Sequence, residues 1–139
     1  MQRFHCFFIL VLLIFLTGCG SGGKVSLKGK VTFADDGSPV SAGTVALVGA
    51  NGKMSRGDIK EDGTYVVGTE KATDGLPPGS YQVFISSALK TIPIDAEKGQ
   101  FNYEQLIAKK YEDPKTSGLT IEVNDSTKTY DIRVERFKK

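Results

Sequence analysis

The sequence predicts an all-β fold, a seven-stranded antiparallel β-sandwich with one inserted loop or short helix. Apolar and polar residues alternate along seven short stretches, and turn pairs such as Asn51-Gly52 and Asp62-Gly63 separate several of them. A side-chain period of two is typical of half-buried strands, and Asn-Gly or Asp-Gly pairs are typical of tight hairpins. Stretches of this kind, without a long helical period, favour two packed sheets.

The first four strands are predicted between residues 25 and 68. The first carries an apolar row on one face: Val25, Leu27, Gly29, Val31 and Phe33. Turn residues at 36–39 end it, and the next strands are expected at 43–49, 53–60 and 64–68. Gly52 and Gly63 lie in the turns between these strands. We expect both to adopt positive φ, because hairpin turns of this type require it.

The other three strands are predicted at 81–85, 119–123 and 130–134. In the first of them Tyr81, Val83 and Ile85 point inward and Phe84 points away from the core. The other two are expected to form a hairpin across a turn at 124–127. Tyr65 and Tyr130, like Tyr81, fall on inward positions of their strands.

The segment from Ala88 to Ser117 interrupts the strand pattern. Asn102, with Gln105 three residues on, resembles the start of a short helix that places Leu106, Ile107 and Tyr111 on one side. We expect this segment to fold back across the outer face of the sheet and bury Phe84 beneath Leu106 or Tyr111. A solvated loop is the alternative.

The amino-terminal residues have the pattern of an export signal. Arg3 precedes ten apolar residues, Phe7–Leu16, which span only about 15 Å as a helix, half of a bilayer core. Leu16-Thr17-Gly18-Cys19 resembles the processing site of bacterial lipoprotein precursors, and a plain secretory signal is the alternative. The resemblance implies a signal peptide at 1–18, a tether at 19–24 and a domain at 25–136 with the insertion 88–117.

Removal of residues 1–18 narrows the chemistry of the mature chain. His5 and Cys6 are lost with the signal, so Cys19 is the remaining cysteine and no histidine is left. Zinc, copper and haem sites and imidazole-based triads depend on those residues. We therefore expect no catalytic, cofactor-binding or metal site, and name Cys19 alone as a functional residue, the site of lipidation.

Carboxylates and net charge give no sign of another site. Acidic residues gather in Asp-Gly and Asp-Pro turn signals: 35–37, 61–63, 74–75 and 112–114. Asp in such places hydrogen-bonds to the nearby backbone, so these stretches are read as turns and not as calcium loops or catalytic pairs. The full chain has a formal net charge of +2, and removal of Arg3 with the signal lowers it to +1. So small a charge argues against a nucleic-acid surface.

A second resemblance covers about residues 25–135. Its motifs are 29–33 (GKVTF), 36–40 (DGSPV), 42–45 (AGTV), 62–65 (DGTY), 74–81 (DGLPPGSY) and 110–120 (KYEDPKTSGLT). In this order they resemble the carboxypeptidase regulatory-like, transthyretin-like (prealbumin-like) β-sandwich family. The resemblance implies a non-catalytic folding or interaction module. The family's hydroxyisourate hydrolase branch uses histidines and a Tyr-Arg-Gly-Ser ending, whereas this chain has no mature histidine and ends Arg136-Phe137-Lys138-Lys139.

These observations lead to one functional expectation and two rivals. The chain is expected to be a cell-envelope lipoprotein, held at the membrane by acyl chains on Cys19, with a protein partner in the envelope and no nucleic-acid partner. Gly20 stands where an inner-membrane retention signal usually has Asp, so the outer membrane is expected. A carbohydrate-binding module is the first rival, and an enzyme using carboxylates is the second.

Overall fold

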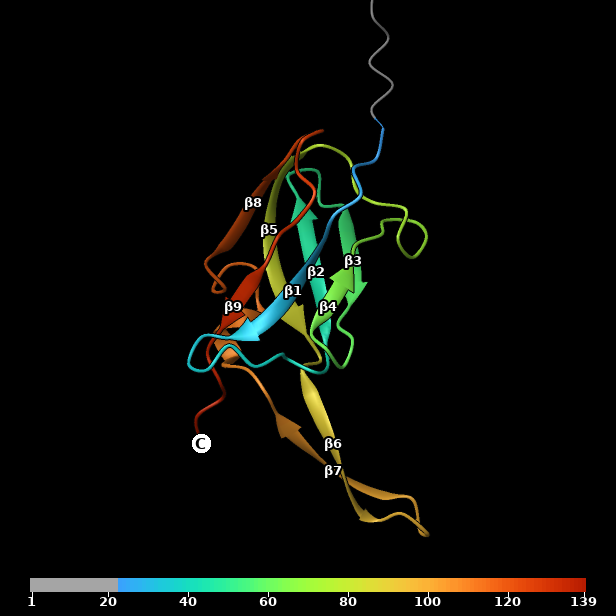
Figure 1. Ribbon diagram of the computed structural model, residues 1–139, viewed down its shortest axis with the longest axis vertical. Coiled ribbons are helices and arrows are strands. Elements are labelled where there is room, and N and C mark those ends of the chain that lie inside the picture. The colour runs from blue at the N-terminus through green and yellow to red at the C-terminus, as the bar shows by residue number, and fades with distance from the viewer. Residues whose placement is uncertain (1–22) are drawn as a thin grey trace, which may run out of the picture.

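The structure, a computed structural model, describes residues 23–139 and is all-β with one short 3-10 helix, η1. Two sheets lie face to face around one core, and a two-stranded ribbon projects from one end (Figure 1). The predicted all-β fold is therefore confirmed. The elements are β1 Lys28–Phe33, β2 Thr44–Gly49, β3 Met54–Asp58, β4 Thr64–Val66, β5 Gly79–Ser86, β6 Leu89–Asp95, β7 Gln100–Gln105, η1 Lys109–Glu112, β8 Leu119–Val123 and β9 Ile132–Val134.

The three-stranded sheet has the order β4-β1-β9. β1 pairs antiparallel with β4, where Gly29 lies opposite Tyr65, but parallel with β9, where Val31 lies opposite Ile132. The expectation of an entirely antiparallel sandwich is thus wrong. A tight turn cannot join two parallel strands. Here β9 reaches β1 only after the chain has passed through the other sheet, so the long connection that a parallel pair needs is present.

The four-stranded sheet has the order β3-β2-β5-β8 and is antiparallel throughout. The β2–β3 hairpin is closed at Asn51-Gly52, and Gly52 has a φ of +76°. Gly63, in the turn before β4, has a φ of +82°. The expectation of positive φ at both glycines is confirmed.

Two connections pass between the sheets where the turn signals predict simple hairpins. β3 and β4 belong to different sheets, and Arg56 and Gly68 join them by a pair of backbone hydrogen bonds. β8 and β9 likewise belong to different sheets, so the hairpin predicted across residues 124–127 is wrong. Asn124 does accept a hydrogen bond from the Ser126 N–H, so the turn forms, but the chain beyond it crosses to the opposite sheet.

The core lies between the two sheets and is built from the predicted inward rows. Leu27, Val31, Val83, Ile85 and Val134 are fully buried. Tyr65 and Tyr81 also belong to the core, whereas Tyr130 is half-buried at its edge. At roughly 1.5–3 kcal/mol for each large apolar side chain buried, this core is the main stabilising feature of the domain.

The segment from Ala88 to Ser117 differs from the prediction in two ways. Asn102 does not cap a helix; it lies in β7, opposite Ile92 of β6. β6 and β7 project away from the sandwich and do not fold across it (Figure 1). Both ends of the segment pack against the domain, since Ala88 is fully buried in the core and η1 contacts β5 and buries Tyr111 there.

Phe84 is half-buried, but the expected cover by the segment is wrong. Residues 89–105 project away from the sheet, Tyr111 lies in the core and Leu106 packs against the core, and Phe84 is not among the residues that contact this core. On the outer face of its sheet Phe84 lies opposite Ala46, which in turn lies opposite Arg56. Ala46 is only 2% exposed, although it is outside the core. A small residue between two long neighbours is readily covered by them, which accounts for the low exposure of Ala46.

Candidate docking surface

The acidic residues singled out in the sequence hold turns, as expected. Asp36 accepts hydrogen bonds from the side chain and the backbone N–H of Ser38, at 2.7 and 2.9 Å. Asp62 does the same for Thr64, and Asp74 accepts from the Thr69 N–H at 2.6 Å. These bonds favour the ionised carboxylate. Those from Ser38, together with the charge of Arg136, lower the pKa of Asp36 to about 2.

No further chemical site emerges among the described residues. Within 23–139, no group of three or more His, Cys, Asp and Glu side chains is placed to hold a metal ion. No helix in this part of the chain is long and apolar enough to cross a bilayer. Cys19, the one predicted functional residue, lies outside the described residues.

The carboxyl-terminal segment is fastened beside the base of the ribbon. The Arg136 guanidinium lies 3.7 Å from the centre of the Phe33 ring and 2.8 Å from carboxylate oxygens of Asp35 and Asp36. Backbone bonds join the Phe137 N–H to Leu106 and the Ala108 N–H to the carbonyl of residue 135. The chain that leaves β7 is therefore held against the end of the chain.

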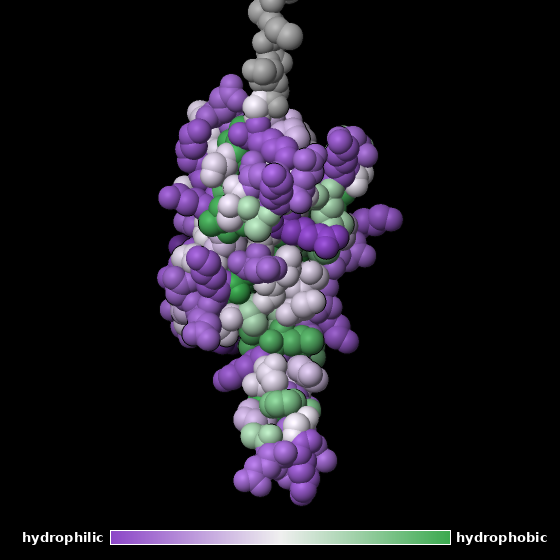
Figure 2. Space-filling view, turned by 90° about the vertical axis from the view of Figure 1, so that its right-hand side faces the viewer, coloured by the Kyte–Doolittle hydropathy of each residue, from purple (hydrophilic) through white to green (hydrophobic). Residues whose placement is uncertain are grey.

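The β6–β7 hairpin carries the large exposed apolar side chains of the described structure. They are Leu89, Ile92, Ile94, Phe101 and Tyr103, with exposures between 39% and 67%. In the space-filling view a band of apolar and neutral residues crosses the projecting ribbon, and the tip beyond it is hydrophilic (Figure 2). Single exposed apolar residues are ordinary, but a group of five on one hairpin makes it the candidate docking surface.

The apolar side chains lie on both faces of this hairpin. Directly opposed residues of an antiparallel pair point to the same side of the ribbon. Thr91 lies opposite Tyr103 and Pro93 opposite Phe101, so both aromatic rings share one face. Ile92 lies opposite Asn102 on the other face, and a β-bulge follows between Pro93 and Asp95.

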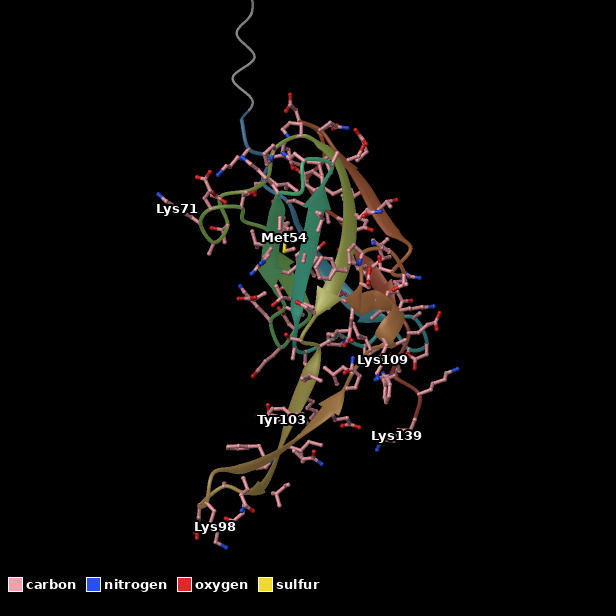
Figure 3. All side chains as sticks on the ribbon, turned by 180° about the vertical axis from the view of Figure 1, so that it is seen from behind. Met54, Lys71, Lys98, Tyr103, Lys109 and Lys139 are labelled. Carbon is pink, nitrogen blue, oxygen red and sulfur yellow. The ribbon has the colours of Figure 1, made fainter. Side chains whose placement is uncertain are left out.

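A groove runs beside the outer edge of β7. It has a volume of about 580 Å³ and lies between the hairpin and the carboxyl-terminal segment. Its walls include Ile92, Tyr103 and Glu104 from the hairpin and Phe137 and Lys139 from the other side. Tyr103 lies on the projecting ribbon, and Lys139 lies to one side of it at about the same height (Figure 3). The groove is open, apolar in part and flanked by one charge of each sign.

The sequence reasoning missed this hairpin, although a signal for it exists. Two stretches rich in β-branched and aromatic residues, 89–94 and 101–103, flank the polar residues 95–99. Gly99 has a φ of +66° in the turn, and Lys98 and Asp95 form an ion pair of 3.0 Å there. Because the ribbon has apolar residues on both faces, it lacks the alternation that marks a half-buried strand.

Comparisons with known proteins add a likeness of fold. No protein-family model matches the sequence, and no curated protein matches it significantly. Among solved structures, the major pilin subunit of Bacillus cereus is similar, with a TM-score of 0.51 and 18% identity over 84% of this chain. This chain spans 30% of that subunit. A 9R-lipoxygenase from Cyanothece aligns over 79% of this chain and 16% of its own, with 15% identity and a TM-score of 0.34. The pilin likeness shows a shared β-rich fold.

Proposed function

We propose that this chain is a lipid-anchored lipoprotein of the cell envelope whose β-sandwich is a non-catalytic structural or protein-interaction module. The export signal and the lipoprotein-type junction at Cys19 support the anchor. Several acyl chains on one cysteine hold a domain at a bilayer far more firmly than one chain does. Gly20, in place of Asp, favours the outer membrane.

One structural observation carries the interaction function. The described chain enters the domain at one end of the long axis, and the apolar β6–β7 hairpin projects from the other end (Figure 1). A domain tethered through Cys19 would hold its attachment end toward the bilayer and present the hairpin away from it. That placement suits a module that contacts another envelope component.

The family assignment is part of the same proposal. The motif order from residue 29 to residue 120 supports a place in the carboxypeptidase regulatory-like, transthyretin-like group. The two sheets of three and four strands agree with such a sandwich in their number of strands. The parallel β1–β9 pair and the projecting hairpin were not expected from the resemblance to this family.

Metabolic labelling of cells with a clickable fatty acid tests the anchor. The wild-type chain and Cys6→Ser should incorporate the label, whereas Cys19→Ser should not and should accumulate as a larger precursor. Cys6 is a matched control because it lies in the part of the chain that processing removes. Equal labelling of Cys19→Ser and the wild type would overturn the anchor, and recovery in the inner-membrane fraction would overturn the outer-membrane assignment.

A carbohydrate-binding module is the second candidate, and one observation favours it. Phe101 and Tyr103 expose their rings on one face of the hairpin, at 48% and 62%. Alternate residues of a strand are roughly 6.8 Å apart, so the two rings form a short platform of the kind that sugars stack on. Retention of the chain by insoluble glycans, lost in Tyr103→Ala and kept in Ile92→Ala, would favour this candidate.

A further inference from the structure

The two edges of the β6–β7 hairpin differ in what they offer to another strand. The Leu106 N–H donates to the Ala88 carbonyl at 2.9 Å, which fixes the alternation of hydrogen-bonded and non-hydrogen-bonded pairs along the hairpin. In that alternation Pro93 and Phe101 form a non-hydrogen-bonded pair, so their backbone groups point outward. Pro93 has no N–H, which weakens the outer edge of β6 as a template for pairing.

The outer edge of β7 has no such interruption. Phe101, Tyr103 and Gln105 direct their backbone N–H and C=O groups outward, and within residues 23–139 no strand pairs with β7 besides β6. The Asn102 side chain accepts the Tyr103 N–H at 2.9 Å, so a flexible side chain covers this donor. The groove of about 580 Å³ follows this same edge.

We propose that the outer edge of β7 is the docking site for an extended segment of another polypeptide, which adds to the hairpin as a third strand. This inference rests on the proposed interaction function. An added strand places its side chains alternately on the two faces of the ribbon. It therefore covers Phe101 and Tyr103 on one face and lies beside the polar Asn102 and Glu104 on the other, with one side chain entering the groove beside Phe137.

Other occupants fit the hairpin less well. A sugar would stack on the Phe101 and Tyr103 rings and leave the outward backbone groups of β7 without a partner strand. A lipid surface would meet a tip that carries Asp95, Glu97 and Lys98, at the end of the molecule away from the tether. A second copy, paired through β7 about a two-fold axis, would place the two amino-terminal ends at opposite ends of the dimer. Two chains anchored in one bilayer cannot adopt that arrangement.

Selection from a display library of random decapeptides on the full chain, purified in detergent, tests the proposal. The enriched peptides should carry apolar residues at alternate positions. Tyr103→Pro should weaken their binding by roughly tenfold or more, because it removes an outward N–H from β7. Thr91→Pro is the matched control, since it removes the outward N–H of the directly opposite residue on β6. It should change the affinity by less than about twofold.

A scan of the best peptide by N-methylation leaves the protein unchanged and so avoids any effect of proline on the hairpin. Methylation at every second amide should abolish binding, and methylation at the others should have little effect, because an edge strand bonds through alternate residues. The proposal is overturned if no peptide is enriched or if both methylation series bind equally. It is also overturned if Thr91→Pro and Tyr103→Pro act alike.

Three further measurements test a glycan, a membrane and a second copy as alternative occupants of the hairpin. Binding to N-acetylglucosamine oligomers or to phosphatidylglycerol vesicles that depends on Tyr103 would replace the polypeptide by a glycan or a membrane. A concentration-dependent dimer in sedimentation that Tyr103→Pro abolishes would replace it by a second copy. If fatty-acid labelling fails but the peptide still binds, the lipid anchor is contradicted and the docking site is still supported.

Discussion

At the scale of single residues, Gly29 shows how one missing side chain sets the position of another. It lies opposite Tyr65 in the β1–β4 pair, and the Tyr65 hydroxyl donates to the carbonyl of Tyr130. A Cβ atom at Gly29 would lie 1.9 Å from that carbonyl oxygen and 2.9 Å from the Tyr65 hydroxyl. The glycine therefore opens the space through which the buried tyrosine reaches the neighbouring segment.

Replacing Gly29 by alanine should lower the free energy of unfolding by about 3 kcal/mol or more, because the new methyl group meets backbone that has no room to move. Gly52→Ala is the control, since Gly52 has a φ of +76° but nothing within 4 Å of a new Cβ. Its cost is the backbone strain alone, about 1–2 kcal/mol. Urea unfolding of the two variants measures the difference, and equal losses would contradict the crowding at Gly29.

At the scale of elements, ion pairs help to hold the carboxyl-terminal segment in place, whereas the strands are held by burial of their apolar side chains. Arg136 joins this segment to the turn after β1 through Asp35 and Asp36 and through the face of Phe33. All three charged groups are substantially exposed to solvent, so each pair contributes modestly. Their effect is to fix where the segment lies.

Stability should respond to acid through Asp36. Hydrogen bonds from Ser38 and the charge of Arg136 lower its pKa to about 2 in the folded chain, below the ordinary value of about 3.9. A carboxylate whose pKa is lowered by folding stabilises the fold above the unfolded pKa and loses that effect as the pH falls toward the folded one. The Tm of the wild type should thus exceed that of Asp36→Asn at pH 5, and the gap should close toward pH 2. A gap that does not change with pH would exclude this role.

The hairpin and the segment that follows it should differ sharply in their sensitivity to truncation. Ile107 is fully buried in the core, whereas Ile94 is 67% exposed on the hairpin. Ile107→Ala should lower the free energy of unfolding by about 2–5 kcal/mol, and Ile94→Ala should change it by less than about 0.5 kcal/mol. Thermal or urea melts of the two variants provide the measurement. A large loss in Ile94→Ala would mean that the hairpin packs against the domain.

Sequence periodicity predicts elements when one of their faces is buried, and fails when neither is. Apolar and polar residues alternate in the rows that contain Val31, Tyr81 and Ile132, because one side of each strand faces the core. These strands form where expected. β6 and β7 bury neither face, so their apolar residues follow no parity. The polar pattern around Asn102 and Gln105 then resembles a helix start, although Gln105 instead bonds to the carbonyl of Ile107.

At the scale of the whole molecule, turn signals tell where the chain changes direction but not which sheet it enters next. The turns after β3 and after β8 both form, yet both lead to the opposite sheet. The partner of a strand is set by packing between residues far apart in the sequence, as in the pairing of Val31 with Ile132. The free edge of β7 depends instead on local pairing, because the phase of the β6–β7 hairpin and the position of Pro93 decide which edge can pair.

The described chain enters the domain at the end opposite the hairpin, and this has a mechanical consequence. A partner that pulled on the hairpin, against an anchor at the other end, would load the domain along its long axis, close to the direction of β5 and oblique to β1 (Figure 1). The hydrogen bonds of β1 to β4 and β9, and of β5 to β2 and β8, lie across that direction. Tension of this kind shears many bonds together and does not open them one after another. With the proposed anchor at one end and a bound strand at the other, the domain would therefore be oriented to carry force between them.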